Sequence, residues 1–249
     1  MRYFLHIAYN GSKYHGWQVQ PNANSVQQEI EKAISIVLRQ NIEIVGAGRT
    51  DAGVNAKSMY AHFDVKNTIE DKQRFLNSLN RLVGKDIAIY DLIDVADDAH
   101  ARFDALSRTY KYIVIHEKNP FIYPLSWHCH YSLDYDKMNK AAAVLKEYTD
   151  FTSFSKLHTD VKTNDCEIYE AEWKRENDVY VFTIKANRFL RNMVRAIVGT
   201  LVEVGRGKMS VDEFREVILK KDRCCAGTSM PPQALYLWNV EYPKEIFKD

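Results

Sequence analysis

Residues 42–65, IEIVGAGRTDAGVNAKSMYAHFDV, contain two apolar runs separated by a glycine-rich segment. Residues 42–47 and 58–65 each have the character of a β-strand, and every second residue of the second run is apolar. The six residues 48–53 hold two glycines, which allow a tight connection. This stretch therefore predicts two strands joined by a short loop.

The segments on either side complete a recurring pattern. Residues 2–9 alternate as a strand, and residues 25–38 begin with a Ser-x-x-Gln capping box and continue with apolar residues at helical spacing. A second amphipathic helix near residues 75–82 and a strand at 87–95 follow. The order β-α-β-β-α-β is the ferredoxin-like arrangement.

The rest of the chain repeats this order with insertions. Its expected elements are a strand at 109–115, a helix at 136–148, a hairpin over 166–186, a helix at 188–204, a further capped helix at 210–220 and a strand at 235–240. The sequence thus predicts the α+β class, with two ferredoxin-like halves, mostly antiparallel sheets, helices on one face and an active-site cleft between the halves. We expect one domain at residues 1–101 and a second at 102–249.

Composition limits the class of protein. The 249 residues include 46% hydrophobic residues, 34 Lys and Arg, and 33 Asp and Glu, for a net charge of +1. These values exclude a wholly disordered chain and one that grips nucleic acid through bulk positive charge. Four cysteines without a C-x-x-C motif favour reduced thiols and a cytoplasmic protein. No apolar stretch is long enough to predict a membrane span.

Positive charge is nevertheless concentrated locally. Residues 185–223 contain ten basic and five acidic residues. Arg188, Arg191 and Arg195 would share one face of the helix expected at 188–204. Such a face is either simply solvated or a stripe that tracks phosphates.

The loop Gly-Arg-Thr-Asp-Ala-Gly-Val at residues 48–54 is the best candidate for chemistry. A carboxylate such as Asp51 can act as a nucleophile or a general base. Arg49 could hold a substrate phosphate or favour the ionised form of Asp51. The alternative is an ordinary turn in which Asp51 hydrogen-bonds its own backbone.

This loop resembles the catalytic motif of the tRNA pseudouridine synthase A family, and further stretches match that family in order along nearly the whole chain. They are residues 9–18 (YNGSKYHGWQ), 100–103 (HARF), 108–112 (RTYKY), 150–154 (DFTSF), 185–189 (KANRF) with 193–195 (MVR), and 235–237 (LYL) with 242–243 (YP).

The resemblance implies isomerisation of uridine to pseudouridine at positions 38, 39 and 40 of the tRNA anticodon stem-loop. It implies a cytoplasmic homodimer that needs neither metal nor organic cofactor. Asp51 would be the nucleophile, and three routes stay open. It could attack the ribose C1′, attack C6 of the ring, or remove a ribose proton to give a glycal.

The resemblance also assigns roles to other residues. Arg195 would pair with Asp51, and Tyr110 would stack on the target uracil, although from pattern alone Tyr110 is a core aromatic. Leu235 would form an apolar wall of the pocket, and Arg49 would help to flip or replace the nucleotide. Further candidate RNA contacts are Lys13, Tyr14, Arg188 and Arg191.

Some positions depart from the family pattern or suggest other chemistry. Asn55 stands where the family commonly has His, and residues 163–165 are less basic than the family pattern. Residues 128–130, His-Cys-His, offer too few ligands for zinc, which needs about four. The neighbouring Cys224 and Cys225 are poorly placed for an ordinary disulfide.

Two other classes of function compete with an RNA-modifying isomerase. A non-catalytic RNA-binding module would have little use for a pocket carboxylate, because RNA phosphates repel it. A small-molecule enzyme would not need the basic stretch or the colinear motifs.

Overall fold

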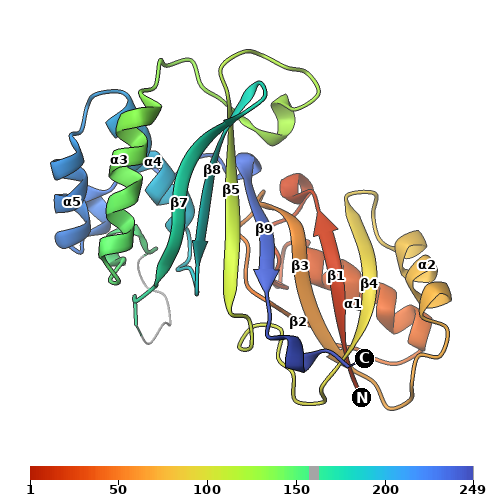
Figure 1. Ribbon diagram of the computed structural model, residues 1–249. Coiled ribbons are helices and arrows are strands. Elements are labelled where there is room, and N and C mark those ends of the chain that lie inside the picture. Colours follow the sequence, from red (N-terminus) through yellow and green to blue (C-terminus); the bar gives the residue numbers. More distant parts are fainter. Residues whose placement is uncertain (157–162, 249) are drawn as a thin grey trace. The chain divides into compact units, whose positions relative to one another are not determined.

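The computed structural model describes residues 1–156 and 163–248 (Figure 1). The chain forms two compact units: Met1–Leu106 with Leu237–Asp249, and Ser107–Tyr236. The strands are mostly antiparallel and the described part contains five α-helices, so the predicted α+β class is confirmed.

The first unit has the predicted β-α-β-β-α-β order. Its elements are β1 (Arg2–Tyr9), α1 (Val26–Leu38), β2 (Val45–Gly46), β3 (Asn55–Asp64), α2 (Lys72–Leu82) and β4 (Ile87–Val95). The sheet runs β4-β1-β3, with β2 also paired to β3, and β9 (Leu235–Glu241) lies next to β3. Strand β1 is antiparallel to both of its neighbours.

Both helices of this unit begin at side-chain caps. The hydroxyl of Ser25 accepts the Gln28 N–H, and the Asp71 carboxylate accepts the Arg74 N–H. The two helices bury apolar stripes against the sheet, which include Ile30 and Ile34 from α1 and Phe75, Leu76 and Leu79 from α2. Capping and burial thus agree on where the helices form.

The C-terminal tail packs on the first unit. Phe4, Val95 and Ala101 form a buried cluster against which Tyr242 and Phe247 pack. The Tyr242 hydroxyl also donates to the Ala101 carbonyl oxygen at 2.5 Å. The compact units therefore divide the chain differently from the expected domains 1–101 and 102–249, because the tail returns to the first sheet.

The second unit repeats the pattern up to its last strand. Its elements are β5 (Ser107–Ile115), β6 (Trp127–His128), α3 (Tyr135–Val144), β7 (Ile168–Glu176), β8 (Val179–Ala186), α4 (Met193–Gly205) and α5 (Val211–Leu219). Strand β8 lies between β5 and β7 and is antiparallel to both. Helices α3, α4 and α5 pack together on one side of this sheet (Figure 1).

Short 3-10 helices connect these elements. They are η1 (Gly11–Lys13), η2 (Tyr123–Leu125), η3 (Leu145–Glu147), η4 (Thr152–Phe154), η5 (Arg223–Cys225), η6 (Pro232–Ala234) and η7 (Lys244–Ile246). No helix in the described part of the chain is long and apolar enough to cross a membrane.

The helix expected over residues 188–204 starts later than predicted. Asn192 has a left-handed φ of 66°, and α4 begins only after it, at Met193. Arg188 and Arg191 therefore precede the helix. The prediction that they share one helical face with Arg195 is wrong.

His62 links β3 to the turn at residues 100–103. Its side chain is buried, and Nδ1 accepts the Ala101 N–H at 3.1 Å. Burial, assisted by the nearby charges of Arg2 and His100, lowers the pKa of His62 to about 4. The neutral ring is therefore the form that holds this turn.

We expect acid to weaken the first unit through His62. The unfolded imidazole has a pKa of about 6.5, so the unfolded state binds the proton first as the pH falls. The contribution of neutral His62 to the unfolding free energy should be complete above about pH 6.5. It should fall by about 3 kcal/mol on reaching pH 4. Urea unfolding between pH 7 and pH 4 measures it. In His62→Asn the amide oxygen can still accept the Ala101 N–H, so the loss should be clearly smaller. Equal losses in both proteins would contradict the assignment.

Candidate active site

Asp51 lies in the loop of residues 47–54, which joins β2 to β3 and is called here the Asp51 loop. Backbone hydrogen bonds tie it to the connection between β1 and α1. The Trp17 N–H donates to the Thr50 carbonyl oxygen at 3.2 Å, and the Gly53 N–H donates to the Tyr14 carbonyl oxygen at 3.2 Å. The residues on both sides of Asp51 are therefore fixed by a neighbouring segment.

Two buried side-chain contacts reinforce this attachment. The hydroxyls of Tyr9 and Thr50 are 2.8 Å apart. The Asn55 Oδ1 atom accepts the Gly11 N–H at 2.9 Å. Asn55, which replaces the expected His, is thus a buried structural acceptor in this chain. No local pattern around Asn55 indicates this role, because Gly11 lies 44 residues away.

Glycines allow the two segments to approach this closely. A Cβ atom on Gly11 would lie 2.0 Å from the Val54 carbonyl oxygen. Gly16 has a φ of 99°, and its Cβ would lie 2.4 Å from the Thr50 carbonyl oxygen. A Cβ on Gly48, in contrast, would meet no atom within 4 Å.

The tip of the Asp51 loop remains accessible. Asp51 is partly buried, whereas Arg49 and Ala52 are exposed. A loop whose ends are firmly held and whose tip is accessible can present a carboxylate to a large substrate.

Lys13 and Tyr14 lie on the segment that holds this loop. The Lys13 Nζ is 2.7 Å from the Asp86 carboxylate, and its side chain stays mostly exposed. Tyr14 is buried, and burial raises the pKa of its hydroxyl. The exposed Lys13 side chain is therefore accessible to a ligand, whereas buried Tyr14 supports the Asp51 loop.

In the second unit, Tyr110 lies on β5 opposite Ile184 of β8. Its ring meets that of Phe189 edge-on, with centroids 5.1 Å apart and an interplanar angle of 85°. Tyr110 is partly exposed, and the edge-on contact with Phe189 restrains its ring.

Arg195 lies in the first turn of α4. It exchanges hydrogen bonds with the segment around Met230, which crosses this helix and is called here the crossing segment. Its Nε–H donates to the Met230 carbonyl oxygen at 2.6 Å, and the Met230 N–H donates to the Arg195 carbonyl oxygen at 3.1 Å. The contact is close because Gly199 has no side chain: a Cβ there would lie 1.8 Å from the Thr228 carbonyl oxygen. The guanidinium is therefore oriented by the backbone of another segment.

Tyr112 brings the crossing segment onto the same face of β5 as Tyr110, two residues away. Its buried hydroxyl donates to the Pro231 carbonyl oxygen at 3.1 Å, and burial raises the pKa of this hydroxyl. Leu235, a few residues further on, is also buried. The Tyr112 hydroxyl and the Arg195 guanidinium thus both bind the segment that follows residue 229 and leads to Leu235.

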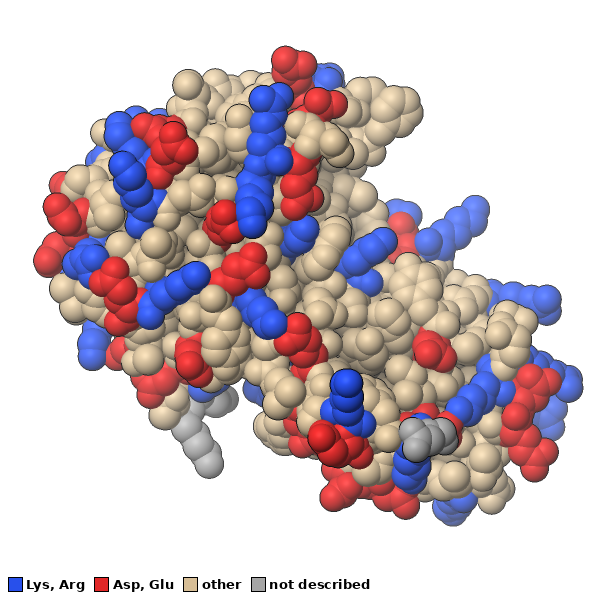
Figure 2. Space-filling model, viewed as in Figure 1, with Lys and Arg blue, Asp and Glu red and all other residues tan. Residues whose placement is uncertain are grey.

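The two arginines expected to contact RNA, Arg188 and Arg191, lie in the bend before α4. Arg188 Nη1 donates to the Thr163 carbonyl oxygen at 3.3 Å, and Arg191 is exposed. Figure 2 shows basic and acidic side chains interspersed on the visible face of each unit. Part of the local positive charge is offset by ion pairs, such as Arg206 with Glu203 and Lys221 with Asp150.

The described residues contain no group of three or more His, Cys, Asp or Glu that could hold a metal ion. His128 and His130 do lie close, with ring centroids 4.2 Å apart. His128 Nε2, however, is 3.2 Å from the His116 carbonyl oxygen, so that nitrogen donates to the backbone.

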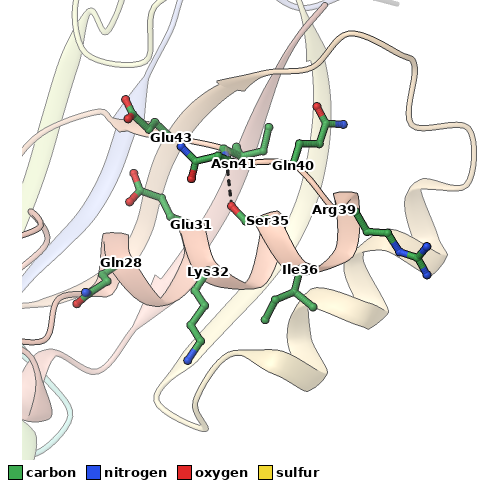
Figure 3. Close-up of a pocket in the computed structure, with 10 residues that line it drawn as sticks. Gln28, Glu31, Lys32, Ser35, Ile36, Arg39, Gln40, Asn41 and Glu43 are labelled. Atoms are coloured by element: carbon green, nitrogen blue, oxygen red, sulfur yellow. Dashed lines mark hydrogen bonds between the residues drawn. The ribbon is translucent and has the colours of Figure 1, made fainter.

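A hollow of about 740 Å³ lies away from Asp51, along α1 and the turn after it (Figure 3). Its polar groups serve the turn: the Ser35 hydroxyl accepts the Ile42 N–H, and Glu31 accepts the Ile44 N–H. These contacts explain the hollow's polar lining without a ligand.

A model of the tRNA pseudouridine synthase family matches residues 6–104 and 142–243. The chain is 58% identical over 246 residues to the tRNA pseudouridine synthase A of Parabacteroides distasonis, covering 99% of this chain and 98% of the relative. It is 57% identical over 248 residues to that of Bacteroides fragilis, with coverages of 99% and 98%. It is 40% identical over 240 residues to that of Bacillus pumilus, with coverages of 95% and 97%.

Gly11→Ala should displace the Asp51 loop, because the new methyl group meets the backbone of Val54. We expect the unfolding free energy to fall by about 3 kcal/mol. Gly48→Ala is the matched control, since its methyl group enters open space, and its effect should stay within about 0.5 kcal/mol. Urea denaturation followed by circular dichroism measures both. Similar losses in the two variants would mean that close approach is not the reason for glycine at position 11.

Proposed function

The chain belongs to the tRNA pseudouridine synthase family, and we propose that it converts uridine to pseudouridine at positions 38, 39 and 40 of the tRNA anticodon stem-loop. The observation that carries the proposal is Asp51, held at the accessible tip of a loop whose base is fixed by buried contacts. A nucleophile must be positioned before the substrate arrives, and a rigid loop does this.

The reaction rearranges bonds without adding atoms. The N1–C1′ bond of uridine breaks, the uracil rotates, and C5 bonds to C1′. The C5 proton leaves and N1 gains a proton, so substrate and product are isomers. Asp51 acts as the nucleophile if it attacks C1′ or C6, and as a base if it removes a ribose proton to give a glycal; an ionised carboxylate suits all three routes.

Arg195 supports Asp51 in this proposal by keeping the carboxylate charged and oriented. Its Nε–H already binds the Met230 carbonyl oxygen, so the edge formed by its two Nη atoms is the part that suits a carboxylate. Lysine has no such planar fork, so the two residues are not equivalent at this position.

Tyr110 stacks on the target uracil after the base has left its stem. The edge-on contact with Phe189 fixes the plane of the Tyr110 ring, which reduces the entropy lost on stacking. Leu235 provides an apolar wall, and exposed Arg49 takes part in flipping or replacing the nucleotide.

The wider RNA contacts are less specific. We propose Lys13, Arg188 and Arg191 as phosphate contacts, with Tyr14 acting through the loop that it supports. We further propose a homodimer acting in the cytoplasm, without a metal or organic cofactor.

Asp51→Ala and Asp51→Asn should abolish turnover while leaving the fold intact. Tritium release from [5-³H]uridine-labelled tRNA should fall about a thousandfold or more, because the nucleophile is lost. tRNA affinity should change less than about threefold. Primer-extension mapping of pseudouridine gives the positions. Full activity in Asp51→Ala would disprove the mechanism. A wild-type protein that binds tRNA but releases no tritium would instead be an RNA-binding module.

Arg195→Ala should lower kcat about a hundredfold, since a misoriented or protonated carboxylate is a poor nucleophile. Arg195→Lys should recover little, and added guanidinium at low millimolar concentration should partly restore Arg195→Ala. Single-turnover tritium release measures these rates, and urea unfolding monitors stability. A large loss of stability without rescue by guanidinium would assign Arg195 a structural role only.

A further inference from the structure

The connection between β5 and β6 carries a strongly exposed aromatic ring. Phe121 has 91% of its surface exposed, more than any other large apolar residue in the described part of the chain. A phenylalanine gains free energy by leaving water, so a ring held in solvent is available to a ligand that covers it.

This connection is firmly built rather than loose. The Asn119 side chain accepts the Phe121 N–H at 3.0 Å, and the Asn119 carbonyl oxygen accepts the Tyr123 N–H at 2.8 Å. The Ser126 hydroxyl donates to the Ile122 carbonyl oxygen at 2.8 Å. Proline on both sides of this turn further limits its conformations. The backbone that carries Phe121 is therefore held in a defined turn.

The connection is attached to the segment that orients Arg195. The Tyr236 hydroxyl donates to the Leu125 carbonyl oxygen at 2.7 Å, and η2 packs against η6. Helix η6 directly follows Met230 and Pro231, whose carbonyl oxygens accept from Arg195 and Tyr112. Phe121 is thus fixed to the same support as the proposed pocket residues of the second unit.

The chemistry around the ring suits a nucleotide. Lys118 Nζ lies 5.7 Å from the centroid of the Tyr123 ring, so a cation stands among the exposed aromatics. A stable protein interface needs roughly 800 Å² on each partner. One strongly exposed ring, with Lys118 three residues before it in the same connection, instead matches one base and its phosphate, the usual means of holding unpaired nucleotides.

We propose that Phe121 stacks on an unpaired base of the tRNA substrate, outside the pocket for the target uridine, with Lys118 near the adjoining phosphate. The inference rests on the proposed function only in taking tRNA as the ligand. This stacking contact would help to hold the distorted stem-loop while the target base is out of its stem.

Binding of an unmodified tRNA transcript with uridine at position 39 tests the proposal. The variants are made in the Asp51→Ala background, so that turnover does not interfere. Phe121→Ala should raise Kd about tenfold, a typical cost of losing one stacked base. Phe121→Leu should lose nearly as much, because it is apolar but cannot stack. Phe121→Trp should bind within about twofold of phenylalanine, with its added fluorescence quenched by the RNA.

Tyr169→Ala is the matched control, because Tyr169 is an exposed aromatic on β7 in the same unit. It should leave Kd unchanged. An unchanged Kd in Phe121→Ala, full binding by Phe121→Leu, an equal loss in Tyr169→Ala, or a change of oligomeric state in Phe121→Ala would each overturn the proposal.

The two proposals fail separately. Normal tritium release by wild type with no effect of Phe121→Ala on Kd would disprove the stacking contact alone. Absent tritium release, with weakened tRNA binding by Phe121→Ala, would disprove the proposed function and support the contact.

Discussion

The position of Asp51 depends on hydrogen bonds between two loops that are far apart in sequence. Carbonyl oxygens of Thr50 and Tyr14 and the side chain of Asn55 join these loops at distances of 2.9–3.2 Å. The contacts require glycine at positions 11 and 16, because any side chain there would enter the opposite backbone. A partly exposed carboxylate thereby gains a fixed position without full burial, which would disfavour its charged form.

In the second unit, too, a side chain proposed to take part in the reaction is oriented by a distant segment of the chain. Arg195 lies on a helix, but its guanidinium is oriented by the carbonyl oxygen of Met230, which belongs to a segment crossing that helix. The close packing of Gly199 and Gly227 brings the two together. In both units, the residues proposed to act on the substrate stand where one chain segment crosses another. Regular elements supply rigidity, and the crossing segments supply orientation.

Local signals in the sequence predicted much of the fold. The caps at Ser25 and Ser210 and the periodicity of the apolar residues indicated α1 and α5 because they act over a single turn. The start of α4 was missed because the left-handed backbone of Asn192 depends on its surroundings, including its hydrogen bond to Ser229. Motif resemblance indicated Asp51, Tyr110 and Arg195 as candidates. It could not indicate Asn55, Met230 or Phe121, since their roles follow from long-range contacts and exposure.

The return of the C-terminal tail to the first sheet makes the second unit an insertion within the first. The chain leaves the first unit after Leu106 and re-enters it at Leu237, and the Leu106 N–H donates to the Glu241 carbonyl oxygen at 2.8 Å beside these junctions. During synthesis, the inserted unit leaves the ribosome complete before the strand that finishes its host. The unit that is begun first is therefore the last to be completed, so the sheet that carries the Asp51 loop gains its final strand only when translation is nearly over.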